Sequence, residues 1–330
     1  MADPTIASDH RSSAGMIDIL AIGEALVEFN QTGDAKGRTY LQGFGGDTSN
    51  ALIAAVRQGA AGSYFTRLGD DEFGRMCLQL WMEERVDARD VVIDATAPTG
   101  IYFVRHGQEG HTFSYLRAGS AASRMQPSDV PTQLIERARF LHVSGISQAI
   151  SASATDTVFH AIRIAKAAGV KVAYDPNLRL KLWPLDRARA VISATIPLAD
   201  YFLPSLDDVR LVSGLDDPAS ILDWCHRQGA RRVVLKLGRE GSVVSDGDCR
   251  MPIAAFPVDA VDATGAGDCF DGSFLARLVL GDDLASAARW ASAAAALTTT
   301  GYGAVAPLPT AAQVARFMET APSRVNSVAG

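Results

Sequence analysis

A glycine-rich turn followed by an acid is the most chemically suggestive part of the sequence, within VDATGAGDCFDGSF at 261–274. Gly265, Ala266 and Gly267 stand where a strand-like segment passes into a predicted helix, and Asp268 falls in its first turn. Unpaired N–H groups and the helix dipole make such a terminus able to bind anions, and glycine lets a phosphate approach the backbone. The same residues could instead form a tight turn beside a helix-favouring acid. As chemistry, the amides can hold a phosphoryl group while the carboxylate accepts the proton of a hydroxyl.

A second glycine-rich stretch, GFGGDTSN at 43–50, also comes just before a predicted helix. Asp47 and Asn50 are common helix-capping residues, and capping alone would explain them. Alternatively, Gly45 and Gly46 let a sugar approach the backbone while Asp47 and Asn50 bond its hydroxyl groups. No G-x-x-x-x-G-K-[ST] sequence occurs, and no G-x-G-x-x-G follows a strand. P-loop and Rossmann-type nucleotide binding are therefore disfavoured.

The composition narrows the range of partners. The 330 residues are 48% apolar and 21% charged, as in an ordinary globular protein, and the formal net charge is −6. Proteins that bind nucleic acids or anionic membranes normally carry a basic excess, so we expect neither partner. The length fits two domains or one large α/β domain with an insertion.

Neither a membrane span nor a secretory signal is expected. The sequence has no apolar run long enough to span a bilayer, and residues 1–15 are polar, without an apolar signal-peptide core. We interpret these residues as a flexible tail on a cytoplasmic protein. The cysteines are far apart and include no C-x-x-C pair, so reduced, mostly buried thiols are expected.

The elements that must position these motifs follow an alternating pattern. Short apolar runs predict strands at 16–22, 63–67, 140–143, 170–174, 201–203 and 233–236, with a further β-rich patch at 242–261. Between and after them, helices are predicted at 47–58, 71–85, 154–168, 187–195, 206–213, 221–228, 266–280, 283–299 and 310–319. Repeated β–α units imply a parallel sheet with helices on both faces.

Two segments break this alternation. Residues 25–44 contain strand-like pieces separated by glycines, and residues 91–117 contain three β-type runs with no helix between them. The second segment is best interpreted as a hairpin outside the main sheet. Together the two segments could form a small sheet that covers part of the molecule.

The two glycine-rich motifs, taken together, resemble the signatures of a known family. GFGGDTSNALIAAVRQGA and VDATGAGDCFDGSFLARL resemble the two signatures of the ribokinase (PfkB) family of carbohydrate kinases. Gly23-Glu24, RLGDDEFG at 67–74 and KLGREG at 236–241 agree with the family pattern. The resemblance extends over about 16–319, which is nearly the whole chain.

The resemblance implies a fold and a set of roles. It implies a ribokinase-like, doubly wound, mostly parallel sheet flanked by helices in one kinase domain at 16–330, with lid segments at about 25–44 and 91–117. Asp268 is then the general base, the amides of 265–267 form the anion hole, and the sugar lies between Gly45-Gly46 and the lid. ATP and Mg²⁺ are implied as cofactors, with a monovalent cation as a further candidate. The implied ATP contacts are Ser205, Lys236, Gly238, Gly241, Thr264, Gly265 and Gly267.

The chain departs from the family pattern at one place. The magnesium-linked N-x-x-E motif of the family falls on Ser205-Leu206-Asp207-Asp208, so serine replaces asparagine and aspartate replaces glutamate. By the family pattern, Asp208 would orient metal-bound water, but with a shorter reach. The alternative for Asp208 is a solvated acid near a helix start.

Three further stretches narrow the branch of the family. TGIYFVRHGQEGHTFSYLRAGSAAS at 99–123, HVSGISQAI at 142–150 and DPNLRLKLW at 175–183 resemble 2-keto-3-deoxygluconate kinases. This resemblance implies that Arg117 and Arg179 contact a substrate carboxylate, which suits the guanidinium group. It implies that Tyr102 and Tyr115 cover the sugar and donate hydrogen bonds. Alternatively, the tyrosines simply pack a hairpin, and Arg179 pairs with Asp175 or Asp186.

The implied reaction is transfer of the ATP γ-phosphoryl group to the C6 hydroxyl of 2-keto-3-deoxygluconate. The alternatives are a fructokinase-like enzyme, a kinase for another keto-deoxy sugar acid, and a catalytically silent sugar-binding homologue. A nicotinamide dehydrogenase is disfavoured because the sequence lacks the dinucleotide-binding glycine motif. The expected partners are the sugar acid and ATP. The edges of a small lid sheet also favour a homodimer through the lid.

Overall fold

The centre of the protein is an eight-stranded sheet. The computed structural model describes residues 17–32, 38–107 and 110–320. The strand order is β14-β13-β12-β11-β10-β9-β1-β4, and neighbouring strands are parallel except in the β12–β13 and β13–β14 pairs. The predicted doubly wound, mostly parallel sheet is confirmed. The strands are Ile17–Ile22 (β1), Gly62–Phe65 (β4), Ala138–Ser144 (β9), Lys171–Asp175 (β10), Tyr201–Phe202 (β11), Val233–Lys236 (β12), Ser242–Ser245 (β13) and Arg250–Ile253 (β14).

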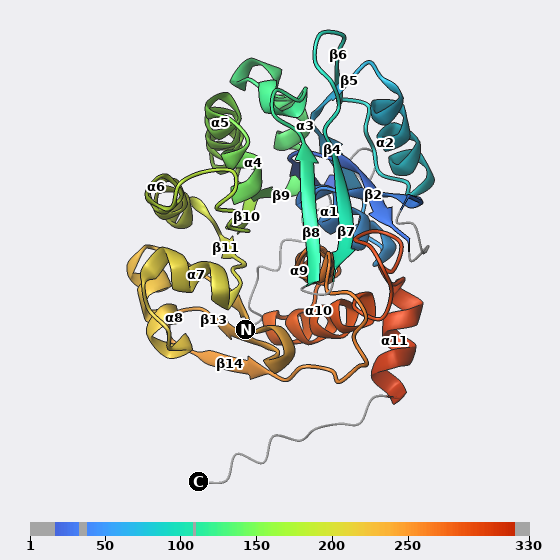
Figure 1. Ribbon diagram of the computed structural model, residues 1–330. Helices are drawn as coiled ribbons and strands as arrows, with labels where there is room; N and C mark the ends of the chain where they lie inside the picture. The colour runs from blue at the N-terminus through green and yellow to red at the C-terminus, as the bar shows by residue number, and fades with distance from the viewer. Residues whose placement is uncertain (1–16, 33–37, 108–109, 321–330) are drawn as a thin grey trace, which may run out of the picture.

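Helices cover both faces of this sheet because its strands bury side chains on both sides. Along β1, Leu20 and Ile22 belong to one apolar core, whereas Ile19 and Ala21 belong to the other. This alternation follows from the two-residue period of a strand. The first core is covered by helices within residues 132–227, and the second by helices within residues 47–83 and 266–320, on opposite sides in Figure 1.

The helices lie close to their predicted positions. The longer ones are Asp47–Arg57 (α1), Glu72–Glu83 (α2), Ala152–Ala168 (α5), Leu185–Thr195 (α6), Leu206–Ser213 (α7), Pro218–Arg227 (α8), Ala266–Val279 (α9), Leu284–Thr298 (α10) and Ala311–Thr320 (α11). The prediction missed two short helices, Thr132–Glu136 (α3) and Gly145–Ala149 (α4). At five residues each, they are too short to show a helical period in the sequence. None of the helices in the described ranges is long and apolar enough to cross a membrane.

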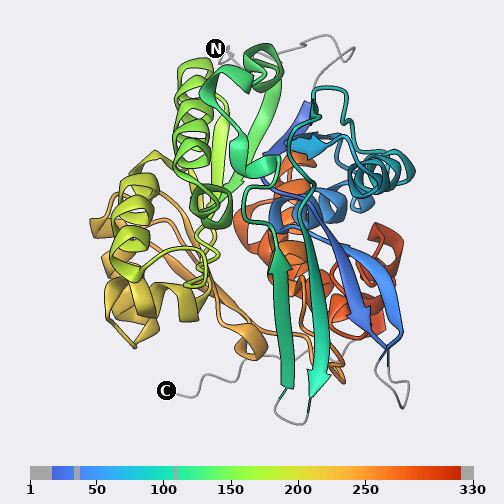
Figure 2. The same cartoon turned by 45° about the horizontal axis from the view of Figure 1, so that its top comes forward.

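A separate four-stranded sheet, which we call the lid sheet, lies across the body, with its strands side by side in Figure 2. Its order is β3-β2-β7-β8, formed by Tyr40–Gly45 (β3), Leu26–Gln31 (β2), Ile101–Gly107 (β7) and Gly110–Leu116 (β8). The β7–β8 pair is the predicted hairpin. Extending the lid back to residue 91 was wrong. Val92–Asp94 (β6) pairs instead with Arg67–Gly69 (β5) in a two-stranded sheet. The Asp94 carboxylate also forms an ion pair with the Arg67 guanidinium at 3.1 Å.

Candidate active site

The glycine turn at the start of α9 presents backbone N–H groups to the edge of the body. Gly265 is in the left-handed region (φ 75°), and a Cβ there would lie 2.9 Å from the Ala304 carbonyl oxygen. No side chain caps α9. Among the described residues, the amides of Gly265 and Gly267 have no protein acceptor, whereas that of Ala266 donates to Ala263 at 3.2 Å. Two of the three predicted anion-hole amides are therefore available to a ligand.

The turn is tied to the loop that follows α10. The Asp262 carboxylate accepts from the Thr264 amide at 2.9 Å and from the Thr264 hydroxyl at 2.6 Å. Its other oxygen accepts from the Gly303 amide at 3.0 Å. Sequence reasoning gave Asp262 no role, although it stands at the start of the turn.

Asp268 lies half-buried at the junction of α1 and α9. The Asn50 side-chain amide donates to its carboxylate at 2.8 Å across 218 residues of sequence. The helices approach closely because Gly272 has no side chain: a Cβ there would lie 1.8 Å from the Ala51 carbonyl oxygen. Burial, and then the negative charge of Asp47, raise the pKa of Asp268 to about 7. Asp268 can therefore change its protonation state near neutral pH.

Buried charges lie around Asp268. Asp47 accepts from the Asn177 side chain at 3.0 Å and from the Thr48 amide at 2.9 Å, so it is held inside the protein. The Lys236 ammonium donates to Asp175 at 3.0 Å and to Asp271 at 2.9 Å.

Lys236, a predicted ATP contact, is therefore in an ion-pair cluster with two buried carboxylates. Burial opposes its charge, but Asp175 and Asp271 together raise the pKa of Lys236 above its usual value. Its ammonium lies 3.8 Å from where a Cβ of Gly267 would be, beneath the glycine turn. Because the Lys236 ammonium bonds to the carboxylates of Asp175 and Asp271, its direct contact with ATP stays a prediction. Its positive charge nevertheless lies close to the glycine turn.

The other predicted ATP residues come from loops after neighbouring strands. Ser205 forms a parallel bridge with Lys236, and its hydroxyl caps α7 by accepting from the Asp208 amide at 3.2 Å. Burial, and then Asp175, raise the pKa of Asp208 to about 6. Gly238 and Gly241 turn the chain between β12 and β13 with positive φ values of 59° and 98°. Ligands of open α/β sheets bind at such strand ends.

The lid sheet places one row of residues over this edge. The strand register sets Gly43, Glu28, Tyr102 and Tyr115 opposite one another across β3, β2, β7 and β8. The Tyr102 hydroxyl donates to the Glu28 carboxylate, and its ring stacks on Tyr115 with centroids 5.5 Å apart. The one phenol hydrogen of Tyr102 is directed at Glu28 in this structure, and hydrogen-bond donation from Tyr102 to the sugar stays a prediction.

Tyr102 also meets the body at the predicted sugar loop. A Cβ on Gly45 would come within 2.4 Å of the Tyr102 hydroxyl oxygen. Gly46, the N-cap of α1, has φ 116°, and a Cβ there would lie 2.3 Å from the Glu24 carbonyl oxygen. The predicted residues Gly45, Gly46 and Tyr102 are therefore brought together.

The two predicted carboxylate-binding arginines have different partners. Arg117 is in an ion pair with the buried Glu24 carboxylate, which also accepts from Ser120 at 2.6 Å. Arg179 is exposed, and within the described part of the chain it bonds only to the carbonyl of its neighbour Leu178, at 2.9 Å. It pairs with neither Asp175 nor Asp186, the alternative left open by the sequence. Arg179 thus offers a guanidinium charge that no described carboxylate neutralises.

The charge of Arg179 nevertheless acts on residues of the candidate site, among them Asp47 and Tyr115. Burial raises the pKa of Tyr115, and the charges of Arg117 and Arg179 act against that rise. Arg117 lies 5.6 Å from the Tyr115 ring centroid, and the charge of Arg179 also acts on Tyr115.

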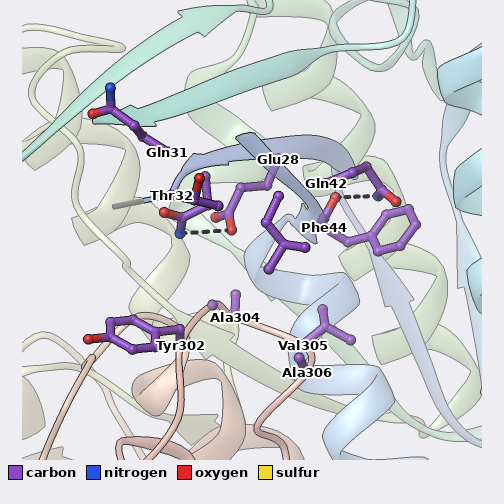
Figure 3. A pocket seen from close by; sticks show the side chains of 13 residues that line it. Glu28, Gln31, Thr32, Gln42, Phe44, Tyr302, Ala304, Val305 and Ala306 are labelled. Carbon is purple, nitrogen blue, oxygen red and sulfur yellow. Dashed lines mark hydrogen bonds between the residues drawn. The ribbon is translucent and has the colours of Figure 1, made fainter. Parts of the chain in front are cut away.

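A cavity of about 730 Å³ adjoins the site between the lid sheet and the loop after α10, as Figure 3 shows. Glu28 lines it, with Asn30, Gln31 and Thr32 on the same strand side and 302–306 opposite. Glu28 lies 3.7 Å from where a Cβ of Gly303 would be, so the cavity ends close to the turn that Asp262 holds. Sequence reasoning missed Glu28 and gave Glu24 no role beyond the family pattern, because the partner of each lies on a distant strand or loop.

Comparison with known proteins places these features in context. A family model described as "pfkB family carbohydrate kinase" matches residues 16–311. Fructokinase-1 of Oryza sativa subsp. japonica is 34% identical over 319 residues, covering 92% of this chain and 98% of the relative. The 2-dehydro-3-deoxygluconokinase of Thermoproteus tenax is 35% identical over 305 residues, covering 90% and 93%.

Solved structures share the whole fold. A putative Ribokinase II from E. coli, in complex with ATP and Mg²⁺, superposes with a TM-score of 0.84 at 25% identity, covering 92% of this chain and 99% of that one. Fructokinase from Vibrio cholerae O395, bound to fructose, ADP and calcium, has a TM-score of 0.84 at 29% identity, with coverages of 92% and 99%.

Proposed function

Because the chain belongs to the pfkB family of carbohydrate kinases, we propose that it phosphorylates a sugar acid, 2-keto-3-deoxygluconate, at the C6 hydroxyl with ATP. The choice of a sugar acid rests on Arg179, whose guanidinium charge is unpaired among the described residues. It is an exposed guanidinium whose charge acts on Tyr115 and which has no described carboxylate partner, whereas Arg117 is already paired with Glu24. A carboxylate on the substrate would supply the missing partner, and such pairs are frequently bidentate.

Asp268 is the proposed general base. Its carboxylate is held by Asn50 and ionises near neutral pH, so it can orient the acceptor hydroxyl and take its proton. In a loose transition state the proton leaves late, as the new O–P bond forms, so a carboxylate is basic enough. The amides of Gly265 and Gly267 hold the transferred group, and the buried charge of Lys236 lies beneath them.

ATP is proposed to lie along the loops after β11 and β12, with contacts from Ser205, Gly238, Gly241 and Thr264. No group of three or more His, Cys, Asp or Glu that could hold a metal ion occurs within the described ranges. Phosphate oxygens and water would therefore supply most of the ligands of Mg²⁺. Asp208 is the acid that fits the metal-linked role, since it is buried at the start of α7 and is ionised above about pH 6. When bound, the ion neutralises phosphate charge.

A substrate panel tests the sugar-acid assignment. We expect 2-keto-3-deoxygluconate to give a higher kcat/KM than fructose, ribose or tagatose in an ATP-coupled assay. Replacing Arg179 with Leu should then raise the KM of the sugar acid about tenfold to a hundredfold, as for loss of a charged hydrogen-bonded pair. The KM of ATP should stay unchanged.

Two controls make this test specific. Arg187→Leu removes an exposed arginine on α6 and should change neither KM. Fructose phosphorylation, where detectable, should be insensitive to Arg179→Leu because fructose has no carboxylate. If fructose is the best acceptor of the wild-type protein, the sugar-acid proposal is wrong.

Fructose is the second candidate acceptor. The observation that favours it is the Arg117–Glu24 ion pair, which leaves one of the two predicted cationic contacts neutralised. A neutral sugar would need neither arginine. The same panel decides between the two acceptors.

A further inference from the structure

The inner row of the lid sheet runs from an acidic end to a basic end. Glu28 stands near Gly303 at one end, and Tyr115 stands near Arg117 at the other, with Tyr102 between them. The charge of Arg179 also acts on Tyr115. Glu28 and Tyr102 are only 3% and 5% exposed, whereas Tyr115 is 41% exposed. A ligand under the lid therefore meets opposite charges at its two ends.

The hydrogen bond between Glu28 and Tyr102 has a fixed direction. The Tyr102 hydroxyl donates to Oε2 of Glu28, and the Asn30 side-chain amide donates to Oε1 at 3.3 Å. Burial, and then the charge of Glu28, raise the pKa of Tyr102 well above its usual value, so the phenol keeps its proton. With its one hydrogen directed at Glu28, the phenol oxygen can only accept a further hydrogen bond.

The phenol oxygen is in reach of the reacting region. It lies against Gly45 at the start of the sugar loop, and the charge of Asp268 is among those that act on Tyr102. A group that accepts hydrogen bonds at this point selects a substrate hydroxyl and disfavours a carbonyl or carboxylate oxygen, which would leave two acceptors facing each other.

We propose that Glu28 is a positioning residue that orients the Tyr102 hydroxyl as an acceptor for a substrate hydroxyl other than the one phosphorylated. The substrate then binds with its hydroxyl-bearing part under Tyr102 and its carboxylate toward Arg179. This inference rests on the proposed function for the carboxylate end; the Glu28–Tyr102 part holds for any polyhydroxylated acceptor.

Three variants and one control test the proposal in the full chain. Tyr102→Phe removes the acceptor, Glu28→Leu leaves the hydroxyl without its orienting partner at similar side-chain volume, and the double variant removes both groups. Val104→Ala, in the next inward-facing position of β7, is the control for a general disturbance of the lid. The acceptor with the highest kcat/KM in the panel is used throughout, so the test does not depend on which sugar that is.

We expect Tyr102→Phe and Glu28→Leu each to raise the KM of the acceptor about tenfold, which is one lost hydrogen bond, with the KM of ATP unchanged. The double variant should be no worse than Tyr102→Phe, because Glu28 acts through Tyr102. The double variant replaces both polar partners, so it remains informative if Glu28→Leu alone folds poorly. Val104→Ala should change the two KM values alike, if at all.

Acceptors that each lack one hydroxyl give a measurement that a merely structural pair would not affect. The penalty of Tyr102→Phe should vanish for the one deoxy acceptor that lacks the hydroxyl bound by Tyr102. Equal penalties for every acceptor, multiplicative effects in the double variant, or an unchanged acceptor KM in Glu28→Leu would each overturn the proposal. If the wild-type protein prefers a neutral sugar, the proposed sugar-acid function is wrong, but the variants of Tyr102 and Glu28 still test the role of Glu28.

Discussion

The body and the lid sheet hold their functional side chains in different ways. In the body, Asp268 is positioned by two helices whose backbones almost touch at Gly272, and by Asn50 from the facing helix. In the lid, Glu28 and Tyr102 are positioned by side-chain contacts along a cross-strand row: the hydrogen bond between them, a bond from Asn30 to Glu28, and the stacking of Tyr102 on Tyr115. Backbone contact leaves little room for adjustment, whereas a side-chain row can shift. In the proposed function, the chemistry is therefore built on the rigid part and the choice of substrate on the adaptable part.

The largest expected effect lies in the body. Asp268→Asn should lower kcat about a thousandfold, within the range for a general base, while both substrates still bind. Steady-state kinetics and ATP titration measure the two effects separately. Asp259→Asn, at an exposed position before the turn, is the control and should leave kcat unchanged. Near-normal turnover in Asp268→Asn would contradict the base assignment.

The same variant should be more stable than the wild type at high pH. The pKa of Asp268 is raised from its ordinary value near 3.8 to about 7 in the folded protein. Because folding raises the pKa of this carboxyl group, its protonated form stabilises the folded protein. That stabilisation is fully present below about pH 4, the unfolded pKa, and is lost as pH rises from about 4 to 7. Asparagine carries no charge to bury, so the Tm of Asp268→Asn should exceed that of the wild type at pH 8, and the difference should shrink at pH 5.

The next effect concerns the helix contact that brings Asn50 to Asp268. Gly272→Ala would place a methyl group 1.8 Å from the Ala51 carbonyl oxygen, and backbone atoms cannot turn away. We expect a loss of about 3 kcal/mol in the free energy of unfolding, at the upper end for overpacking. Urea unfolding measures it. Gly281→Ala, where φ is 98° but the space is open, should cost only about 1 kcal/mol of backbone strain.

A pH profile gives a third and smaller effect in the body. Because the base must be ionised, kcat/KM should fall about tenfold for each pH unit below the pKa of about 7. Asp208, with a pKa of about 6, is the rival titrating group. Asp208→Asn should keep the limb near pH 7 if Asp268 is responsible. Disappearance of that limb in Asp208→Asn would assign it to Asp208 instead.

The contrast between body and lid also explains what could be predicted from the sequence. The turn at Gly265–Gly267 and Asp268 was visible because glycine and an acid at a strand–helix junction form a local signal. The Glu28–Tyr102 bond was not, because it joins residues 74 apart through the register of two strands. The resemblance to a family gave roles to Tyr102 and Arg117 but none to their partners Glu28 and Glu24, and those partners change what each side chain can do.

The smallest expected effect comes from two adjacent glycines at the boundary between the regions. Gly45 ends β3 of the lid, and Gly46 is the N-cap of α1 in the body. Gly45→Ala would meet the end of the Tyr102 side chain at 2.4 Å, which can swing aside, so we expect little loss of stability and about a threefold rise in the acceptor KM. Gly46→Ala would meet the Glu24 carbonyl oxygen at 2.3 Å with φ 116° and should cost about 2 kcal/mol in stability.

Thermal unfolding and acceptor kinetics on both variants test this difference. In a Tyr102→Leu background the clash at residue 45 is relieved, so Gly45→Ala should then add no further rise in the acceptor KM. The cost of Gly46→Ala should be the same in either background, because it arises from backbone atoms of the body. Two results would contradict this difference: equal effects of the two glycine variants, or a Gly45→Ala effect that persists in the Tyr102→Leu background. Either result would mean that the lid does not adjust by moving the Tyr102 side chain, and the division between a rigid body and an adaptable lid would fail at their boundary.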